Sequence, residues 1–517
     1  MLLYLGVGAT VLTGCASHKA KRNSDTKRPN VILLVADDIG YGDLSPYGEP
    51  TVSTPQVERL ASRGLRFTDA HAVASTSTPS RYSLLTGHYS WRRNDTGVAA
   101  GNAGMIIRPE QQTVADLFRQ QGYVTGAVGK WHLGLADKTG AQDWNGHITP
   151  GPSDIGFDYS YIMAATGDRV PCVWVENEHV VGLDLTDSIF VSYRAPFEGE
   201  PLGKDHPELL TKLRPSPNHG HDQAIVNGIS RIGYMKGGRG ALWEDENIAD
   251  SITAHAVKFI EDNAASPFFL YLGTNDIHVP RYPHERFRGK SGMGMRGDAL
   301  LQFDWTVGAV LDALERQGIA DNTLIILTSD NGPVVDDGYA DQSVEQLGAH
   351  RPWGNLRGGK YSNFEAGTRV PLIVSWPKRV KSGVSDALVS QIDLFASMAS
   401  LVQADIAEGA APDSRDALSV LLGTDKEGRE YIVEKAGSIS LYDGEWKYIA
   451  PSNGYAYNSL TNIELGNDRQ PQLYRLTDDL GERHNVAGQY PEVVARMQQL
   501  LQDEIKRKVG WGYAVSE

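Results

Sequence analysis

Carboxylate and amide side chains directly follow two apolar runs in this sequence. The run at residues 30–36 leads to Asp37 and Asp38, and the run at residues 323–328 leads to Asp330 and Asn331 after one serine. Such pairs are either solvated turn residues or metal ligands, and their recurrence favours ligands. Oxygen donors alone suit a hard cation, and several carboxylates with an amide favour Ca²⁺ over Mg²⁺. Without a cation, the neighbouring carboxylates would raise one another's pKa values.

Basic side chains follow other predicted strands. Lys130 and His132 come after a predicted strand at residues 123–129, and His278 follows one at residues 268–274. In an extended segment, residues two apart point to the same side, so Lys130 and His132 would place a fixed cation and a titratable base over one anionic reaction centre. A lone Lys-x-His pair is more often an exposed surface feature.

The segment at residues 77–87, STPSRYSLLTG, predicts a loop that becomes a helix. Pro79 suits the first helical turn because its missing N–H is not needed there. Unpaired N–H groups and the helix dipole would favour an anion next to Ser77, and Arg81 adds a permanent cation one turn later. The alternative is an ordinary surface helix that begins with proline.

Helical and strand patterns alternate over residues 30–412. They predict an α/β domain with a mostly parallel sheet flanked by helices on both faces. In such sheets ligands bind beyond the carboxyl ends of the strands, where the residues named above lie. The further strands are expected at residues 65–69 and 369–376, and the helices at residues 54–64, 113–121, 247–264 and 298–317.

Two regions depart from this alternation. Residues 137–245 are rich in Gly, Pro, His and aromatic residues with weak periodicity, and we expect an insertion that determines substrate specificity. Residues 413–517 predict a small C-terminal antiparallel sheet covered by one helix, which is an α+β subdomain. Its strands are expected at residues 430–434, 438–442, 446–450 and 472–476, and its helix at residues 491–508.

Composition limits the partners. The chain has 517 residues and a formal net charge of −15, which argues against nucleic acid as a partner. No apolar run is long enough to span a bilayer. Residues 1–29 predict a bacterial lipoprotein signal and a polar tether, with Leu12-Thr13-Gly14-Cys15 as the lipidation site. The expectation is export to the periplasm or cell surface of a Gram-negative bacterium, anchored only by a lipid on Cys15; an N-terminal helix with an incidental Cys is the alternative.

The motif from Ser77 to Gly87 resembles the signature of the formylglycine-dependent sulfatases, in the alkaline phosphatase superfamily. Gly129-Lys130-Trp131-His132-Leu133-Gly134 resembles their second signature, and the segment from Leu473 to Asn485 is similar to their C-terminal subdomain. The resemblance implies an alkaline-phosphatase-like fold. It also implies that a maturation enzyme that accepts serine oxidises Ser77 to formylglycine, and that one Ca²⁺ is bound by Asp37, Asp38, Asp330, Asn331 and the oxidised Ser77.

The resemblance also implies catalytic roles. The hydrated aldehyde would attack sulfur, His132 would take the proton of its second hydroxyl, and His278 would protonate the leaving sugar alcohol beside Lys360. Lys130 and Arg81 would hold the sulfate oxygens. The substrate would be a sulfated carbohydrate, galactose or N-acetylgalactosamine with a 6-O or 4-O sulfate. Short matches place Asp168, Arg169, His221 and Arg357 at the sugar.

Two alternatives stay open at this point. A phosphatase or phosphodiesterase of the same superfamily would use two Zn²⁺ ions and needs histidines at the metal positions, where this chain has Asp330 and Asn331. A non-catalytic glycan-binding relative would be expected to lack Lys130, His132 or His278, and all three are present.

Overall fold

The structure is a computed structural model that describes residues 28–48 and 51–510. The lipoprotein signal, most of the tether and Cys15 lie outside the described residues. Within the part that is described, no helix is long and apolar enough to cross a membrane.

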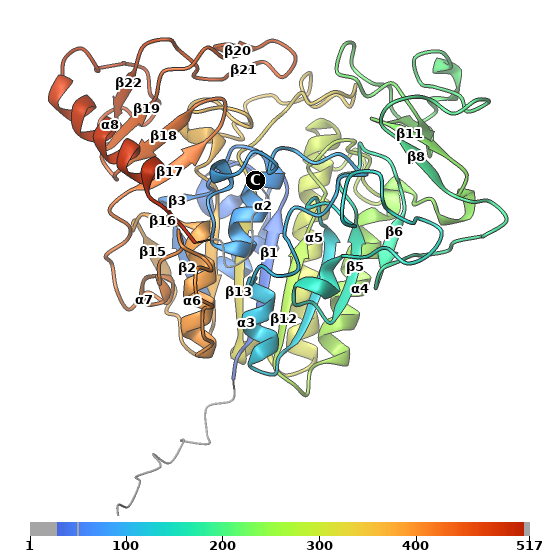
Figure 1. The fold of residues 1–517 in the computed structure, drawn as a ribbon, viewed down its shortest axis with the longest axis horizontal. Helices are drawn as coiled ribbons and strands as arrows, with labels where there is room; N and C mark the ends of the chain where they lie inside the picture. Colours follow the sequence, from blue (N-terminus) through green and yellow to red (C-terminus); the bar gives the residue numbers. More distant parts are fainter. Residues whose placement is uncertain (1–27, 49–50, 511–517) are drawn as a thin grey trace, which may run out of the picture.

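A ten-stranded sheet forms the centre of the molecule (Figure 1). Its five middle strands run parallel, and shorter strands at both edges add antiparallel pairs. The middle strands are buried because their sequences are apolar runs, and all seven residues of β1 are buried. The strand order is β15 (Gly383–Ser385), β2 (Gly64–Phe67), β14 (Leu372–Ser375), β13 (Thr323–Ser329), β1 (Asn30–Ala36), β12 (Phe268–Gly273), β4 (Val124–Lys130), β5 (Tyr159–Met163), β6 (Trp174–Glu176) and β7 (His179–Val180).

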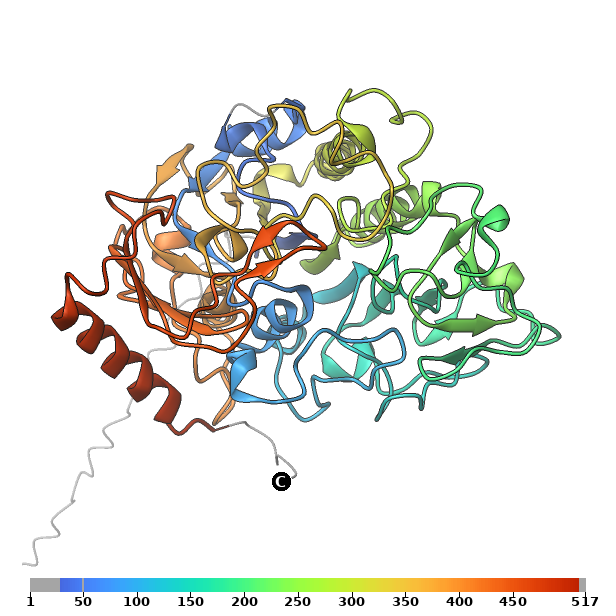
Figure 2. The same ribbon diagram turned by 90° about the horizontal axis from the view of Figure 1, so that it is seen from above.

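Helices cover both faces of this sheet (Figure 2). The long helix α5 packs against α1 and α4 on one face, and α6 packs against α2 and α3 on the other. The expected α/β architecture of a mostly parallel sheet between helices is therefore confirmed. The helices are α1 (Pro55–Ala61), α2 (Ser77–Thr86), α3 (Val114–Gln120), α4 (Ile248–Asp262), α5 (Gly294–Arg316), α6 (Leu394–Val402) and α7 (Leu418–Leu421).

The region expected to be an insertion, residues 137–245, has two parts. Its strands β5, β6 and β7 extend the large sheet, so this portion belongs to the central architecture. The remainder carries two short antiparallel pairs, β8 (Phe190–Ser192) with β11 (Tyr234–Lys236) and β9 (Ile225–Val226) with β10 (Ile229–Ser230). The limits of the insertion and of the two domains stay predictions.

The expected small C-terminal sheet is confirmed. Four antiparallel strands lie beside the large sheet, and α8 (Pro491–Lys506) covers them (Figure 1). The strands are β17 (Ile432–Lys435), β18 (Ile439–Tyr442), β19 (Trp446–Ile449) and β22 (Gln472–Arg475). The hairpin of β20 (Tyr457–Asn458) and β21 (Ile463–Glu464) extends toward the carboxyl ends of the parallel strands, and β3 (Ala70–His71) pairs with β16 (Val389–Ser390).

Candidate active site

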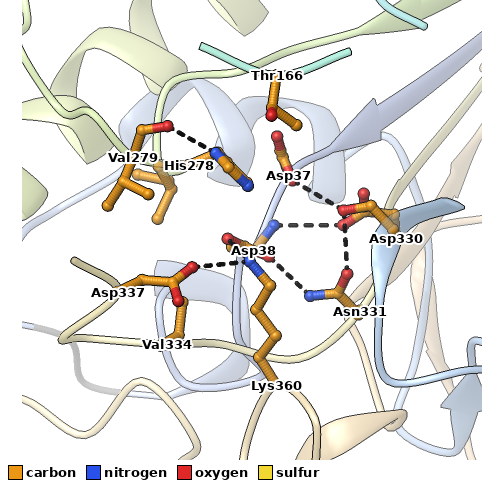
Figure 3. A network of polar contacts seen from close by, with 12 residues as sticks. Asp37, Asp38, Thr166, His278, Val279, Asp330, Asn331, Val334, Asp337 and Lys360 are labelled. Atoms are coloured by element: carbon orange, nitrogen blue, oxygen red, sulfur yellow. Dashed lines mark hydrogen bonds and ion pairs between the residues drawn. The ribbon is translucent and has the colours of Figure 1, made fainter. Parts of the chain in front are cut away.

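The two acidic pairs meet at the carboxyl end of the sheet because β1 and β13 are adjacent parallel strands (Figure 3). The backbone N–H of Asp38 donates to Asp330 Oδ1 across 3.3 Å, and Asn331 Nδ2 donates to Asp38 Oδ1 across 2.8 Å. These contacts fix the Asn331 amide so that its Oδ1 lies 3.3 Å from Ser77 Oγ. All four acidic and amide residues are buried. The convergence expected from the two strand ends is therefore present.

Ser77 lies at the centre of this cluster. Helix α2 begins at Ser77 itself and not at Pro79, so the serine occupies the positive end of the helix dipole. Its Oγ accepts a hydrogen bond from Lys130 Nζ at 2.8 Å and lies 3.4 Å from Asp37 Oδ1. Lys130 also pairs with Asp37 at 2.6 Å. An anionic group at position 77 would therefore face a helix N-terminus and a buried ammonium group.

Arg81 has a different position from the one expected. Its guanidinium donates to Asp330 Oδ2 at 2.9 Å and to the Tyr271 hydroxyl at 2.8 Å, and it is fully buried. It does not line the cavity at Ser77. These contacts hold Arg81 against Asp330, and the role expected for Arg81 at the sulfate oxygens stays a prediction. The motif spacing gave no sign that Tyr271 and Asp330 would engage the guanidinium.

His132 reaches the cavity by a left-handed backbone turn. Strand β4 ends at Lys130, and His132 has a φ of 59°, so the two side chains are not related by the strand alternation that we expected. His132 Nε2 lies 2.9 Å from the carbonyl oxygen of Ala99, which makes Nε2 the protonated nitrogen. Nδ1 is buried and has no hydrogen-bond partner among the described residues. Burial, with the nearby Lys130, lowers the pKa of His132 well below its usual value, so its free Nδ1 is a neutral base.

His278 and Lys360 lie close to Asp38 in the acidic cluster (Figure 3). His278 Nδ1 lies 2.7 Å from the Val279 carbonyl oxygen, which leaves Nε2 toward the cluster. Lys360 Nζ bridges Asp38 at 2.8 Å and Asp337 at 2.9 Å. Burial alone would lower the pKa of Lys360, but the two carboxylates outweigh it and raise that pKa, so the ammonium stays charged.

A cavity of about 240 Å³ opens over Ser77. Three of the four residues predicted to bind the sugar line it, namely Asp168, Arg169 and His221. Arg169 Nη1 donates to Asp168 Oδ1 at 2.8 Å, and His221 Nε2 lies 3.0 Å from Asp168 Oδ2. Burial would raise the pKa of Asp168, but Arg169 and His221 hold it well below its usual value. The result is a fixed carboxylate with cationic and imidazole neighbours, which suits recognition of sugar hydroxyl groups.

The fourth predicted residue, Arg357, lies outside this cavity. Its guanidinium pairs with Glu464 at 2.7 Å and lies over the Phe364 ring. Arg357 instead lines a second cavity next to this one, so its place at the sugar stays a prediction. Its partner Glu464 comes from a hairpin more than one hundred residues away in sequence.

Several cavity residues were missed in the sequence. They include Thr76, Val98, Ile232, Asp337, Tyr361, Asn458, Leu460 and Thr461. Asp337 receives Lys360, and the Tyr361 hydroxyl donates to Asp337 at 3.1 Å. Asn458, Leu460 and Thr461 belong to the β20–β21 hairpin of the C-terminal region. These residues lie in loops without periodicity, so only the tertiary packing brings them to the site.

The acidic cluster fits a divalent cation. Asp37 Oδ2 is buried without a hydrogen-bond partner among the described residues, and burial raises the pKa of Asp37 despite Lys130. Four carboxylates (Asp37, Asp38, Asp330 and Asp337) face three cations (Arg81, Lys130 and Lys360) in one contact network. One net negative charge remains, which a divalent cation together with a sulfate monoester anion would neutralise. The donors are oxygens, as Ca²⁺ prefers.

The same residues fit a zinc site less well than a calcium site. His278 offers one nitrogen within 4.8 Å of Asp37 and Asp38 oxygens, and it is the single histidine in that group. A second buried group, His71 with Glu365 and Glu434, is already satisfied by Lys447, whose Nζ bonds both glutamates. The described residues therefore lack the several histidines that a two-zinc hydrolase needs.

Comparison with known proteins shows to which family this chain belongs. Residues 29–404 match the family model described as Sulfatase. The chain is 53% identical to an N-acetylgalactosamine-6-O-sulfatase of Bacteroides thetaiotaomicron, over 97% of this chain and 98% of that protein. It is 30% identical to human arylsulfatase A, over 91% of this chain and 87% of that protein.

A solved structure supports the same family assignment. A Bacteroides thetaiotaomicron sulfatase, described in connection with the metabolism of multiple glycosaminoglycans, superposes with a TM-score of 0.91 at 54% identity, over 93% of this chain and 100% of that one. The chain therefore belongs to the sulfatase family. It is a sulfuric ester hydrolase with an alkaline-phosphatase-like fold, as the sequence resemblance implied.

Proposed function

We propose that this sulfatase removes the 6-O-sulfate group of N-acetylgalactosamine in a sulfated glycan. Support comes from the 53% identical relative, which has that activity, and from the cavity over Ser77. The observation that carries the proposal is the contact of Ser77 Oγ with both Lys130 and the acidic cluster, directly below Asp168, Arg169 and His221 in one cavity. Galactose 6-O-sulfate and 4-O-sulfated sugars are the nearest competing substrates.

We further propose that Ser77 is oxidised to formylglycine and that Asp37, Asp38, Asp330 and Asn331 hold one Ca²⁺ with it. The hydrated aldehyde would supply a nucleophilic hydroxyl together with a second hydroxyl for the release of sulfate, and the cation would supply charge stabilisation. The donor set and the unpartnered Asp37 oxygen support this assignment. A maturation enzyme that accepts serine is then a required partner, and lipidation at Cys15 remains the proposed anchor for an exported protein.

Residues of the chain would stabilise charge, transfer protons and orient the sugar. Lys130 holds the oxygen at position 77 and offsets negative charge there. His132 accepts a proton at Nδ1, the nitrogen that has no hydrogen-bond partner within the described part of the chain. His278 carries a proton at Nε2 to the oxygen of the leaving sugar, beside the ammonium of Lys360. Asp168 orients the sugar hydroxyl groups, with Arg169 and His221 fixing its carboxylate.

A panel of defined sulfated monosaccharides tests the proposal. The 6-sulfates of N-acetylgalactosamine, galactose and N-acetylglucosamine, and the 4-sulfate of N-acetylgalactosamine, are compared by kcat/KM for sulfate release. We expect N-acetylgalactosamine 6-sulfate to be preferred. Arg169→Ala and His221→Ala should lose at least about tenfold on this sugar and little on a small aryl sulfate, because a fixed polar contact is worth about 1–3 kcal/mol.

Arg239→Ala is the matched control, since that arginine side chain is 70% exposed and does not line the cavity. The substrate assignment would be overturned if the enzyme preferred another sulfate position. It would also be overturned if the Arg169 and His221 variants turned over the preferred sugar as fast as the wild type.

A further inference from the structure

A second cavity lies beside the catalytic one. Its volume is about 290 Å³, against about 240 Å³ for the cavity over Ser77. Its walls come from residues 333–358, which follow the acidic pair on β13, and from the β20–β21 hairpin with Arg483. None of the residues given roles in the hydrolysis of the sulfate ester lines it.

The two cavities share one wall. Thr461 lines both cavities. The adjacent residues Asp336 and Asp337 line different cavities, Asp337 the catalytic one and Asp336 the second. The hairpin is anchored next to Lys360, because Ser362 Oγ donates to the Glu464 carbonyl at 2.6 Å and the Asn363 N–H donates to the Leu465 carbonyl at 2.9 Å. A molecule longer than one sugar can therefore contact both cavities across Thr461.

Thr461 itself has unused bonding capacity. Its side chain is 6% exposed, and its Oγ1 is buried without a hydrogen-bond partner among the described residues. A buried hydroxyl without a partner is costly, so a group from outside the chain is expected at this position. A ligand hydroxyl at the junction of the two cavities would satisfy it.

The second cavity combines an apolar wall with polar edges. Val334, Leu347 and the half-exposed Trp353 form the apolar part, and Asp336 and Arg483 lie at the edges. Arg483 makes no hydrogen bond to another described residue, whereas Arg357 is held by Glu464 and the Glu482 carbonyl. A pyranose ring has an apolar C–H face and hydroxyl groups on its rim, and this wall is complementary to both features.

We propose that this cavity binds the sugar adjacent to the sulfated one, so that the enzyme recognises at least two sugars of an oligosaccharide. The inference rests on the proposed function. The apolar face of the second pyranose packs on Trp353, its hydroxyl groups bond Asp336 and Arg483, and the linkage between the two sugars passes Thr461. The C-terminal hairpin thus selects substrate length.

The test compares a 6-sulfated N-acetylgalactosamine monosaccharide with a disaccharide that carries the same sugar at its non-reducing end. Wild type should show a higher kcat/KM on the disaccharide. Trp353→Ala and Arg483→Ala should each lower the disaccharide value about tenfold, as expected for truncation of a contact residue, while the monosaccharide value changes less than about twofold. Trp353→Phe should keep most of the disaccharide value because an aromatic face remains.

Trp305→Ala, on α5 and against Arg286, is the matched control and should change neither value. Thermal unfolding of each variant reports folding, and the unchanged monosaccharide rate reports an intact catalytic cavity. Equal kcat/KM on both substrates in wild type, or equal losses on both in Trp353→Ala, would overturn the second sugar site alone. No turnover of either substrate by the matured wild type would overturn the proposed function and this site with it.

Discussion

Lys130 donates a hydrogen bond from Nζ to Ser77 Oγ across 2.8 Å, in a position fully removed from solvent. Burial lowers the pKa of this ammonium group, and Asp37 and Asp330 oppose that effect. The contact ties the end of β4 to the start of α2. It places a compact cation at the oxygen where the proposed reaction begins.

Replacing Lys130 by methionine should therefore remove activity and keep the fold. The thioether fills the space of the ammonium stem but offers no charge to the oxygen at position 77. We expect a loss of about 10²–10³ in kcat, the range seen when one preorganised stabilising donor is removed. Steady-state rates and the circular dichroism of the same preparation measure both effects.

Lys258→Met is the matched control, because that lysine is exposed on α4, where it pairs with Asp262. Near-normal rates from Lys130→Met would contradict the role given to the ammonium group.

Removal of the cation should have the same effect as removal of its ligand. Asp330→Ala deletes a proposed calcium ligand that follows β13 and lies outside the apolar core, so we expect loss of activity without loss of the buried sheet. Exhaustive chelation of the wild type should abolish turnover, and added Ca²⁺ should restore it. Metal analysis of the active enzyme should give one calcium per chain; full activity after chelation, or stoichiometric zinc, would contradict this.

His278 should matter only when the leaving group needs a proton. A sugar alcohol is a poor leaving group, whereas a phenol leaves without protonation. His278→Ala should therefore lose about 10²–10⁴ in rate on a sugar sulfate and far less on an aryl sulfate. The ratio of the two rates is the measurement, with His206→Ala, an exposed histidine, as the control. Equal losses on both substrates would remove His278 from the acid role.

The sequence was sufficient to predict the parts of the site that lie at strand ends. Strand β1 is an uninterrupted apolar run whose polar residues begin at Asp37, and β13 ends in the same way before Asp330. Parallel pairing of β1 with β13 then brings the two acidic pairs together. Such arguments rest on local pattern and on one rule of sheet topology.

Local patterns did not predict contacts between residues that are far apart in the sequence. Tyr271 and Asp330 hold Arg81, and Glu464 holds Arg357, and none of these pairs could be read from motif spacing. Asp337 and Thr461 had no distinguishing context in the sequence. Loops carry these side chains, and the position of a loop is set by packing that has no periodic pattern.

A buried ionic cluster joins strand β3 to the C-terminal sheet, and it should make stability pH-dependent. His71 lies 2.8 Å from both Asp69 and Glu434, with Glu365, Lys447 and Arg369 next to this group. Burial would lower the pKa of His71, but the carboxylates outweigh it and raise the pKa from 6.5 to about 9. A raised pKa stabilises the folded chain fully below the unfolded value, and this stabilisation disappears as the pH rises through about 9.

His71→Gln should therefore lower the melting temperature most near pH 6 and least above about pH 10, where the wild-type imidazole is also neutral. The stabilisation at stake is on the order of 3 kcal/mol at low pH. Thermal unfolding of both proteins across this range gives the difference. A difference that stays constant with pH would show that His71 is not protonated in the folded chain. His179→Gln, an exposed histidine, provides the control.

The central claim is that Ser77 is the precursor of the nucleophile and not the nucleophile itself. A serine sulfate would be a stable alkyl ester with no internal route to release, whereas a hydrated aldehyde can expel sulfate with the help of a base such as His132. Mass spectrometry of the peptide that carries Ser77, from a preparation of known turnover, tests this most directly. The account predicts a species lighter by two hydrogens than the serine form, in proportion to activity across preparations. Many turnovers per active site from protein whose Ser77 is wholly unmodified would contradict it.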